Sequence, residues 1–375
     1  MRTGKTGLLV HLIDELRLGG AQTHLVTMLR EACQRYPFRH RVLSLFGDGP
    51  IGEELRAVGV EVVALDLRPQ LARRRFLAAA NLLRRWVRGA AVVEAHLTWS
   101  RLLGLYAAWR ERAPVRIGFE QGDIYLNSWK FRVANFVHQA FAQRIVVCSQ
   151  ALADWVSATH RISRRRLLVM HNCVDTDRFR PGLDADVSVR EGWPPEATVF
   201  AAVGSLGRGV NKRVDICLKA LALARERGAD VRLVVCGDGQ QRPELQELAM
   251  RLGLDETVRF LGTRRDVERV LAASDGLCHA APFEPFGIVA IEAMACGLPV
   301  IVPGSGGIRE AVEHGKTGFL YPALDHAALA DWMITLHRQP DLRREVGLRA
   351  RQTVESTFSV ERYVRRLYAL YGLDT

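Results

Sequence analysis

The stretch that most constrains the fold runs from residue 278 to residue 303, where a loop, a helix and a strand follow one another directly. Two prolines flank Glu284, so this carboxylate lies on a stiff, irregular loop. Residues 288–296 contain no helix breaker and are followed by a glycine and a proline, as is typical of a capped helix end. Residues 300–302 then predict a short buried strand.

The start of this helix predicts an anion site. Glu284 stands just before the helix and Glu292 lies one to two turns inside it. Free backbone N–H groups would face the same ligand as Glu284, and they belong to Phe286, Gly287, Ile288 and Val289. Such helix ends attract phosphate, so a ligand with both phosphate and hydroxyl groups is expected, such as a sugar nucleotide. The alternative is a purely structural helix with one acid near its start and one on its exposed face.

The complete string resembles the E-x7-E signature of the GT4 family of retaining glycosyltransferases, which have the GT-B fold. Here it is written Glu284-Pro-Phe-Gly-Ile-Val-Ala-Ile-Glu292, and the continuation Ala-Met-Ala-Cys-Gly-Leu-Pro-Val-Ile also matches the family. The resemblance implies an α/β protein with two Rossmann-like, doubly wound domains that face a cleft. It also implies a C-terminal helix that crosses back to the first domain.

The length of 375 residues independently favours two domains, because a single core rarely spans so many. We place the N-terminal, acceptor-side domain at residues 1–178, together with a C-terminal helix at 358–375. The nucleotide-sugar-binding domain occupies residues 179–357. Residues 167–181 resemble the hinge segment of the family, and the polar residues 182–197 fit a linker.

The first domain opens with a buried-strand pattern at residues 7–13, a turn at Gly19 and Gly20, and an amphipathic run. Strand, glycine turn and helix form the first unit of a doubly wound sheet. In the resembling family such a turn lies close to the donor phosphates and the acceptor. A tight turn without a ligand is the alternative.

His96 ends the predicted strand 91–96, and α/β folds place ligands at the carboxyl ends of their strands. A lone histidine is more often structural, but the resemblance implies an active-site histidine at this position. After the next strand, at 115–119, many family members have Thr-x-His. Here the residues are Glu120, Gln121 and Gly122, a departure that leaves the acceptor side open.

The second domain opens with a strand at 199–203 and a glycine loop that carries Arg208 and Lys212. The loop lacks the Gly-Lys-Ser/Thr of a Walker A motif, so we reject that interpretation. Cations on such a loop can neutralise a diphosphate. The family has an arginine and a lysine in this loop. Lys212 matches the lysine. Ser205 stands at the usual position of the arginine, so Arg208 is a substitute for it. Two solvated loop cations are the alternative.

The resemblance implies transfer of a hexosyl unit from a nucleoside-diphosphate sugar, preferably a UDP-sugar and otherwise GDP-mannose, with retention. The acceptor would be a glycan or lipid-linked hydroxyl in cell-surface polysaccharide or glycolipid synthesis. Glu284 would hold donor hydroxyls, Glu292 the ribose, and His96 the donor or acceptor, while Gly262 and Thr263 would pack on the base. No metal-ligand spacing occurs, so we expect neither metal nor cofactor. A sugar-nucleotide epimerase, a phosphorylase and a non-catalytic basic module stay open.

The net charge of +11 is concentrated in the first domain. Residues 1–178 contain 27 arginines and lysines against 15 acids, whereas residues 179–375 contain 25 against 26. A helix predicted at 71–88 places apolar residues on one face, namely Phe76, Ala80, Leu83 and Val87. Its other face carries Arg74, Arg85 and Arg88. A solvated surface helix is the simpler interpretation. The more specific interpretation is that this face contacts an anionic membrane or an anionic acceptor. We expect no nucleic-acid partner.

The seven cysteines are scattered singly, which indicates reduced thiols and a cytoplasmic protein. No stretch approaches the roughly 20 apolar residues of a membrane span, and no signal peptide is visible. We therefore expect a cytoplasmic protein, placed at the inner face of the plasma membrane if the basic helix binds lipid.

Overall fold

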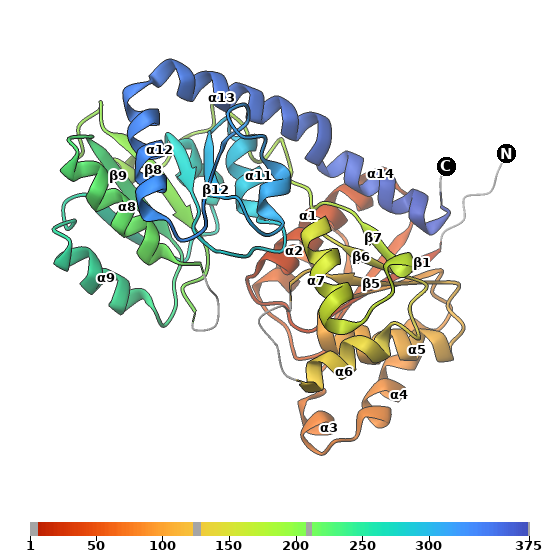
Figure 1. Cartoon of the computed structure of the whole chain (residues 1–375). Coiled ribbons are helices and arrows are strands. Elements are labelled where there is room, and N and C mark those ends of the chain that lie inside the picture. The colour runs from red at the N-terminus through yellow and green to blue at the C-terminus, as the bar shows by residue number, and fades with distance from the viewer. Residues whose placement is uncertain (1–6, 123–128, 208–211, 374–375) are drawn as a thin grey trace. The chain divides into compact units, whose positions relative to one another are not determined.

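The computed structural model describes residues 7–122, 129–207 and 212–373, which form two compact units (Figure 1). The first unit comprises Met1–Cys173 and Val360–Thr375, and the second unit comprises Val174–Ser359. Each unit is built on one parallel β-sheet.

The sheet of the first unit has the order β3-β2-β1-β4-β5-β6-β7. Its strands are β1 Leu8–Ile13, β2 Arg39–Ser44, β3 Glu61–Ala64, β4 Val92–His96, β5 Val115–Glu120, β6 Arg144–Val147 and β7 Leu167–Val169. Its α-helices are α1 Gly20–Arg35, α2 Pro50–Ala57, α3 Arg68–Ala72, α4 Phe76–Val87, α5 Leu105–Arg110, α6 Trp129–His138, α7 Gln150–His160 and α14 Val360–Tyr371. The direction of winding reverses between β1 and β4, which is where such sheets bind ligands.

The sheet of the second unit has the order β10-β9-β8-β11-β12-β13. Its strands are β8 Thr198–Val203, β9 Val231–Cys236, β10 Val258–Gly262, β11 Gly276–Cys278, β12 Val300–Pro303 and β13 Phe319–Tyr321. Its α-helices are α8 Val214–Glu226, α9 Arg242–Arg251, α10 Val267–Ala272, α11 Ile288–Ala295, α12 His326–Arg338 and α13 Pro340–Thr353. Here the reversal lies between β8 and β11.

The two doubly wound sheets confirm the predicted α/β architecture. Helix α14 lies against α1 in the first unit (Figure 1), although the preceding helix α13 belongs to the second unit. Tyr363 and Leu367 are buried at helical spacing and join a core with Leu9 of β1. The C-terminal helix therefore completes the hydrophobic core of the N-terminal unit.

The prediction of one helix over residues 71–88 is wrong in its N-terminal part. Helices α3 and α4 are separated by three arginines, of which Arg74 adopts a left-handed φ of 54°. Phe76, expected on the buried face, is 41% exposed and stacks on Trp99. The break has a physical cause, because no apolar side chain between Ala72 and Phe76 anchors the chain to the core.

The segment after Gly307 packs against the start of α11. The structure has only the 3-10 helix η5, Ile308–Ala311, and the chain leaves it in an extended conformation at Val312. The single turn places the Ile308 side chain against Gly287, so this segment packs on the start of α11 and does not extend away from it.

Candidate active site

Lys212 and Glu284 meet at the reversal point of the second sheet. Lys212 precedes α8 in the loop after β8, and Glu284 lies in the loop after β11. The Lys212 Nζ donates a hydrogen bond to Glu284 Oε1 within an ion pair. Two loops that are 72 residues apart in the chain are thus joined where α/β sheets place ligands.

Glu284 is a buried carboxylate with one oxygen held by two partners. Oε1 accepts from Lys212 and lies 3.1 Å from Nε2 of His279. Burial raises the pKa of this carboxyl, but the charge of Lys212 and the hydrogen bond from His279 outweigh it and lower the pKa to about 2. Among the described residues none donates a hydrogen bond to Oε2, so this oxygen is available to a ligand hydroxyl.

His279 is a site residue that the sequence reasoning missed. It directly follows β11 and is only 4% exposed. Its backbone carbonyl accepts a hydrogen bond of 2.9 Å from the Tyr321 hydroxyl, which anchors it to β13. The only signal was its place at the end of a buried strand, the same signal that singled out His96. We regard His279 as a residue that orients Glu284.

Glycines allow the loops around this pair to pack backbone against backbone. A Cβ at Gly237 would lie 1.9 Å from the carbonyl oxygen of Gly204, and one at Gly306 would lie 2.8 Å from the Glu284 nitrogen. Gly204 itself contacts the Lys212 side chain, with 3.1 Å from its ideal Cβ position to Cε. The Lys212 side chain thus lies against the Gly204 backbone, and its ammonium contacts Glu284.

The N-terminus of α11 has no side-chain cap. Gly287 takes the cap position with a left-handed φ of 79°, and an added Cβ would lie 2.6 Å from Ile308. The Phe286 side chain is buried against Phe358, so this residue can offer a ligand only its backbone. Ile288 and Val289 form the first turn, whose N–H groups have no intrahelical acceptor. The binding of an anion by these N–H groups stays a prediction.

Glu292 lies on α11, one turn beyond the site, and is half-buried. Within the described part of the chain its carboxylate takes part in no hydrogen bond. Burial raises the pKa of Glu292 to about 7, although the positive charge of Arg178 acts in the opposite direction. This carboxyl therefore changes its charge near neutral pH.

If Glu292 binds ribose hydroxyls, as the family resemblance implies, its pKa predicts a pH-dependent affinity for a nucleotide sugar. A carboxylate binds hydroxyl groups through charge-assisted hydrogen bonds, which are about twice as strong as neutral ones. We expect the Kd for UDP-glucose to rise about tenfold from pH 8 to pH 6, with an inflection near 7. Calorimetry with wild type and Glu292→Gln checks this, since the diphosphate of UDP-glucose does not titrate in this range. An equally pH-dependent variant would contradict the assignment to Glu292.

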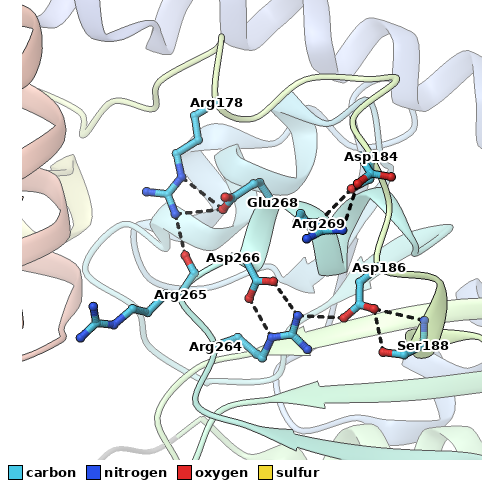
Figure 2. A network of polar contacts seen from close by, with 9 residues as sticks. All are labelled: Arg178, Asp184, Asp186, Ser188, Arg264, Arg265, Asp266, Glu268 and Arg269. Carbon is cyan, nitrogen blue, oxygen red and sulfur yellow. Dashed lines mark hydrogen bonds and ion pairs between the residues drawn. The ribbon is translucent and has the colours of Figure 1, made fainter.

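The loop after β10 is fixed by a network of charged side chains (Figure 2). Arg264 contacts both Asp266, at 2.6 Å, and Asp186, at 2.8 Å. Arg178 pairs with Glu268 at 2.9 Å. The network ties the loop to the segment that enters the second unit. Two predicted base-contacting residues begin this loop, namely Gly262, with a left-handed φ of 70°, and Thr263, which is exposed.

In the first unit, the predicted residues lie at the corresponding reversal point between β1 and β4. Gly19 precedes α1 and Gly20 is its first residue. Asp14, just after β1, accepts a 2.7 Å hydrogen bond from the backbone N–H of Ser100, which ties this loop to the one after β4. His96 ends β4 but is only 1% exposed, and its ring stacks on Phe119. Its buried position differs from that expected of a substrate-binding group.

Arg208 lies outside the described residues, so its role stays a prediction. The fold also gathers His11, Glu94 and His96, whose potential ligand atoms lie within 4.8 Å of one another. His11 Nδ1 lies 2.6 Å from Glu94 Oε2, so these two side chains are hydrogen-bonded within a buried polar cluster.

No helix in the described ranges has the length and apolar character to span a membrane.

Comparison with known proteins agrees with this geometry. The family model Glycosyltransferase Family 4 matches residues 18–178, and the model Glycosyl transferases group 1 matches residues 186–353. The chain belongs to the GT4-type glycosyltransferases. This confirms the family that the sequence motifs indicated.

Curated relatives match part of the chain. A D-inositol 3-phosphate glycosyltransferase from a Mycobacterium species is 36% identical over 240 residues, 62% of this chain and 52% of its own length. An N-acetyl-alpha-D-glucosaminyl L-malate synthase from Bacillus anthracis is 36% identical over 160 residues, 43% of this chain and 42% of its own length. The aligned stretch thus spans about half the length of these relatives.

Solved structures share the fold of the whole chain. HepE from Anabaena, in complex with UDP and glucose, superposes with a TM-score of 0.84 at 22% identity and covers 98% of this chain and 99% of its own. Sucrose-phosphate synthase from Thermosynechococcus elongatus gives 0.79 at 19% identity and 98% coverage of each chain. At this identity the likeness establishes the GT-B fold.

Proposed function

We propose that this protein transfers a hexosyl unit from a nucleoside-diphosphate sugar to an acceptor hydroxyl. The observation that carries the proposal is the buried Glu284 carboxylate, held by Lys212 and His279 at the reversal point of the second sheet. A cation, an uncapped helix start and a carboxylate together provide what a sugar diphosphate requires. The complex of HepE with UDP-glucose supports UDP as the preferred nucleotide, with GDP-mannose as the second choice.

In this proposal each group has a separate task. Negative charge develops on the diphosphate as the sugar departs, and Lys212 and the amides at the start of α11 stabilise it. Glu284 Oε2 accepts hydrogen bonds from sugar hydroxyls, and Glu292 accepts them from the ribose. Because protein groups stabilise the leaving charge, we propose that transfer needs no metal ion and no cofactor. Retention of configuration is the outcome that family membership favours.

Two chemical classes of acceptor are considered. We propose a glycan or lipid-linked acceptor in cell-surface polysaccharide or glycolipid synthesis, on the strength of the basic first unit. The relatives named above are named for inositol 3-phosphate and malate, which are small soluble acceptors. Both classes therefore belong in the test.

A donor panel tests the proposal. Release of free nucleotide is measured from UDP-glucose, UDP-galactose, UDP-N-acetylglucosamine and GDP-mannose, in the presence of a chelator and with each acceptor class. We expect UDP release that increases with the correct acceptor. Interconversion of UDP-sugars without release would indicate an epimerase. Salt-dependent nucleic-acid binding with no turnover of any donor would indicate a non-catalytic module.

Membrane contact is a second proposal, carried by the surface around α4. Leu77 and Leu82 are 66% and 42% exposed on this helix. Exposed arginines surround them, at Arg73–Arg75 and Arg85. Exposed apolar side chains among cations are typical of a surface that lies against anionic lipid. We therefore propose a peripheral site at the inner face of the plasma membrane.

The variant Arg74→Ala/Arg85→Ala/Arg88→Ala is expected to weaken binding to phosphatidylglycerol vesicles. Each basic residue near such a surface contributes about 1 kcal/mol, so the partition constant should fall about 100-fold. Co-sedimentation with vesicles measures it. A control with the same charge change replaces exposed arginines of the second unit, namely Arg251, Arg344 and Arg349. Equal sedimentation of the two variants would remove the proposal.

A further inference from the structure

The pairing of two parallel strands gathers three potential metal ligands inside the first unit. His11 of β1 is the partner of Glu94 of β4 in the register of the sheet. His96 lies two residues after Glu94 on the same strand, so its side chain points to the same face. The three side chains are at most 1% exposed, and one potential ligand atom of each lies within 4.8 Å of the others.

The distances in this cluster suit a small divalent ion. Glu94 Oε2 lies 2.6 Å from His11 Nδ1 and 3.8 Å from His96 Nε2. In a tetrahedral zinc site with bonds of about 2.0 Å, neighbouring ligand atoms lie about 3.3 Å apart. The two distances fall on either side of this value, so side-chain shifts of about half an ångström would reach it. Two imidazoles and a carboxylate form a donor set that zinc uses, with the fourth position left for a water molecule.

The Nε2 of His96 is a buried ring nitrogen that takes part in no hydrogen bond among the residues that the structure describes. Its distance of 3.8 Å to Glu94 Oε2 is too long for one. A buried polar atom without a partner destabilises a fold, and a metal ion bound to this nitrogen would satisfy it.

The second ring nitrogen of each histidine is held as it is in metal sites. A histidine that binds a metal usually directs its other ring nitrogen to a hydrogen-bond partner, which fixes the orientation of the ring. His96 Nδ1 lies 3.4 Å from Gln121 Oε1, and His11 Nε2 lies 3.0 Å from His40 Nδ1. Both rings therefore turn their remaining nitrogen toward the cluster.

Glu94 carries the negative charge that a metal ligand needs. Burial raises the pKa of Glu94, but the charge of His11 and its hydrogen bond outweigh burial and hold the pKa far below its usual range. The other oxygen, Oε1, accepts a hydrogen bond from the hydroxyl of Tyr371 on α14. An ion would therefore be bound by Oε2.

The hydrogen bonds behind His11 adapt to an ion. His40 Nε2 lies 3.1 Å from the hydroxyl of Tyr368 on α14. Each imidazole can carry its proton on either nitrogen. Without an ion, His11 donates from Nδ1 to Glu94 and accepts at Nε2 from His40. With an ion on Nδ1, His11 carries its proton at Nε2 and donates to His40, which in turn donates to Tyr368.

We propose that His11 Nδ1, Glu94 Oε2 and His96 Nε2 bind one zinc ion. Through the hydroxyls of Tyr371 and Tyr368, this ion fastens the C-terminal helix α14 to the sheet of the first unit. Its role is structural, because all three ligands are buried and the site lies wholly within the first unit. The proposed sugar transfer uses groups of the second unit, so the inference goes beyond that function and does not depend on it.

Metal content tests the inference. The full chain is produced in medium with added zinc chloride, passed through gel filtration in EDTA and analysed by plasma mass spectrometry. We expect about one zinc ion per chain in the wild type and loss of most of it in His96→Asn. Asparagine keeps a polar atom near the position of Nδ1 but has none at that of Nε2. Wild type without zinc, or His96→Asn with the wild-type amount, would overturn the inference.

The matched control is His326→Asn, at the exposed first residue of α12, which should keep the wild-type zinc content. His96→Asn should have the circular dichroism and thermal midpoint of zinc-free wild type, because the nitrogen that it removes makes no hydrogen bond.

Two measurements on the wild type do not depend on that variant. Protein produced with cobalt in place of zinc should show the visible absorption bands of tetrahedral Co(II), and a spectrum without them would overturn the site. Hydrogen exchange of the α14 amides should be at least about tenfold slower in zinc-loaded than in zinc-free protein. Equal exchange in the two forms would overturn the fastening of α14.

Discussion

Glu284→Ala is expected to abolish sugar transfer while the chain still folds. The substitution removes a carboxylate that Lys212 and His279 keep ionised, and with it the proposed acceptor for the donor hydroxyls. Loss of one preorganised polar group at a reacting centre typically lowers kcat by about 100- to 1000-fold. The fold should survive because the Lys212 side chain is 21% exposed and its ammonium can turn to water. Single-turnover rates with UDP-glucose and circular dichroism check both parts.

A matched control for this variant is Glu313→Gln, which removes the carboxylate of an exposed pair with Lys316. We expect wild-type turnover from it, since this pair lies on the solvated surface. Normal turnover in Glu284→Ala would contradict the assignment of the donor site.

Glu284→Gln should also reveal the electrostatic contribution of this residue to stability. The folded-state pKa of about 2 lies below the ordinary value of 4.5, so the ionised carboxylate stabilises the fold above pH 4.5. This contribution is lost as the pH falls from 4.5 toward 2. The difference in unfolding free energy between wild type and Glu284→Gln should therefore be present at pH 7 and shrink across this window.

Lys212→Met is expected to lower kcat about 100-fold and to weaken UDP binding. In the proposed mechanism this cation stabilises the charge that develops on the diphosphate, and methionine keeps the length of the side chain without that charge. The variant also leaves Glu284 as a buried carboxylate without its ion-pair partner, so its pKa should rise. Initial rates and calorimetry with UDP measure the two effects. Lys212→Arg should recover part of the activity, because it keeps the charge but changes its geometry.

Lys219→Met provides the control for this prediction. Lys219 lies on α8, is 43% exposed and pairs with Asp215 at 3.9 Å, so it has the same charge without a place at the site. We expect turnover and UDP affinity like those of the wild type. Equal losses in Lys212→Met and Lys219→Met would indicate a general effect of charge and would contradict a local role for Lys212.

The strand and helix pattern could be predicted well because it depends on local physics. The buried strand ending at His96, the helix from Ile288 and the terminal helix ending at Tyr371 all follow from apolar periodicity with glycine or proline at the boundaries. The prediction failed at residues 73–75, where three arginines have good helix propensity but no core contact. Propensity alone does not hold a helix together in water.

The site was only partly predictable. The pair Glu284 and Lys212 came from motifs and the structure joins them directly, yet the third member, His279, looked like any residue at the end of a strand. In the first unit His96, at the end of β4, is buried. Gln121, which lies 3.4 Å from His96, appeared in the sequence only as part of a departure from a family pattern.

Sequence alone determined the class of fold and the family, and it singled out Glu284 and Lys212, because these depend on residue types at short spacings. Tertiary structure decided which polar groups face solvent. Glu94 and Tyr371, which are 277 residues apart, meet only after β4 enters the sheet and α14 packs on α1. The burial of His96 follows from that packing, since the accessibility of a side chain is a property of the assembled layers and not of any local stretch of the chain.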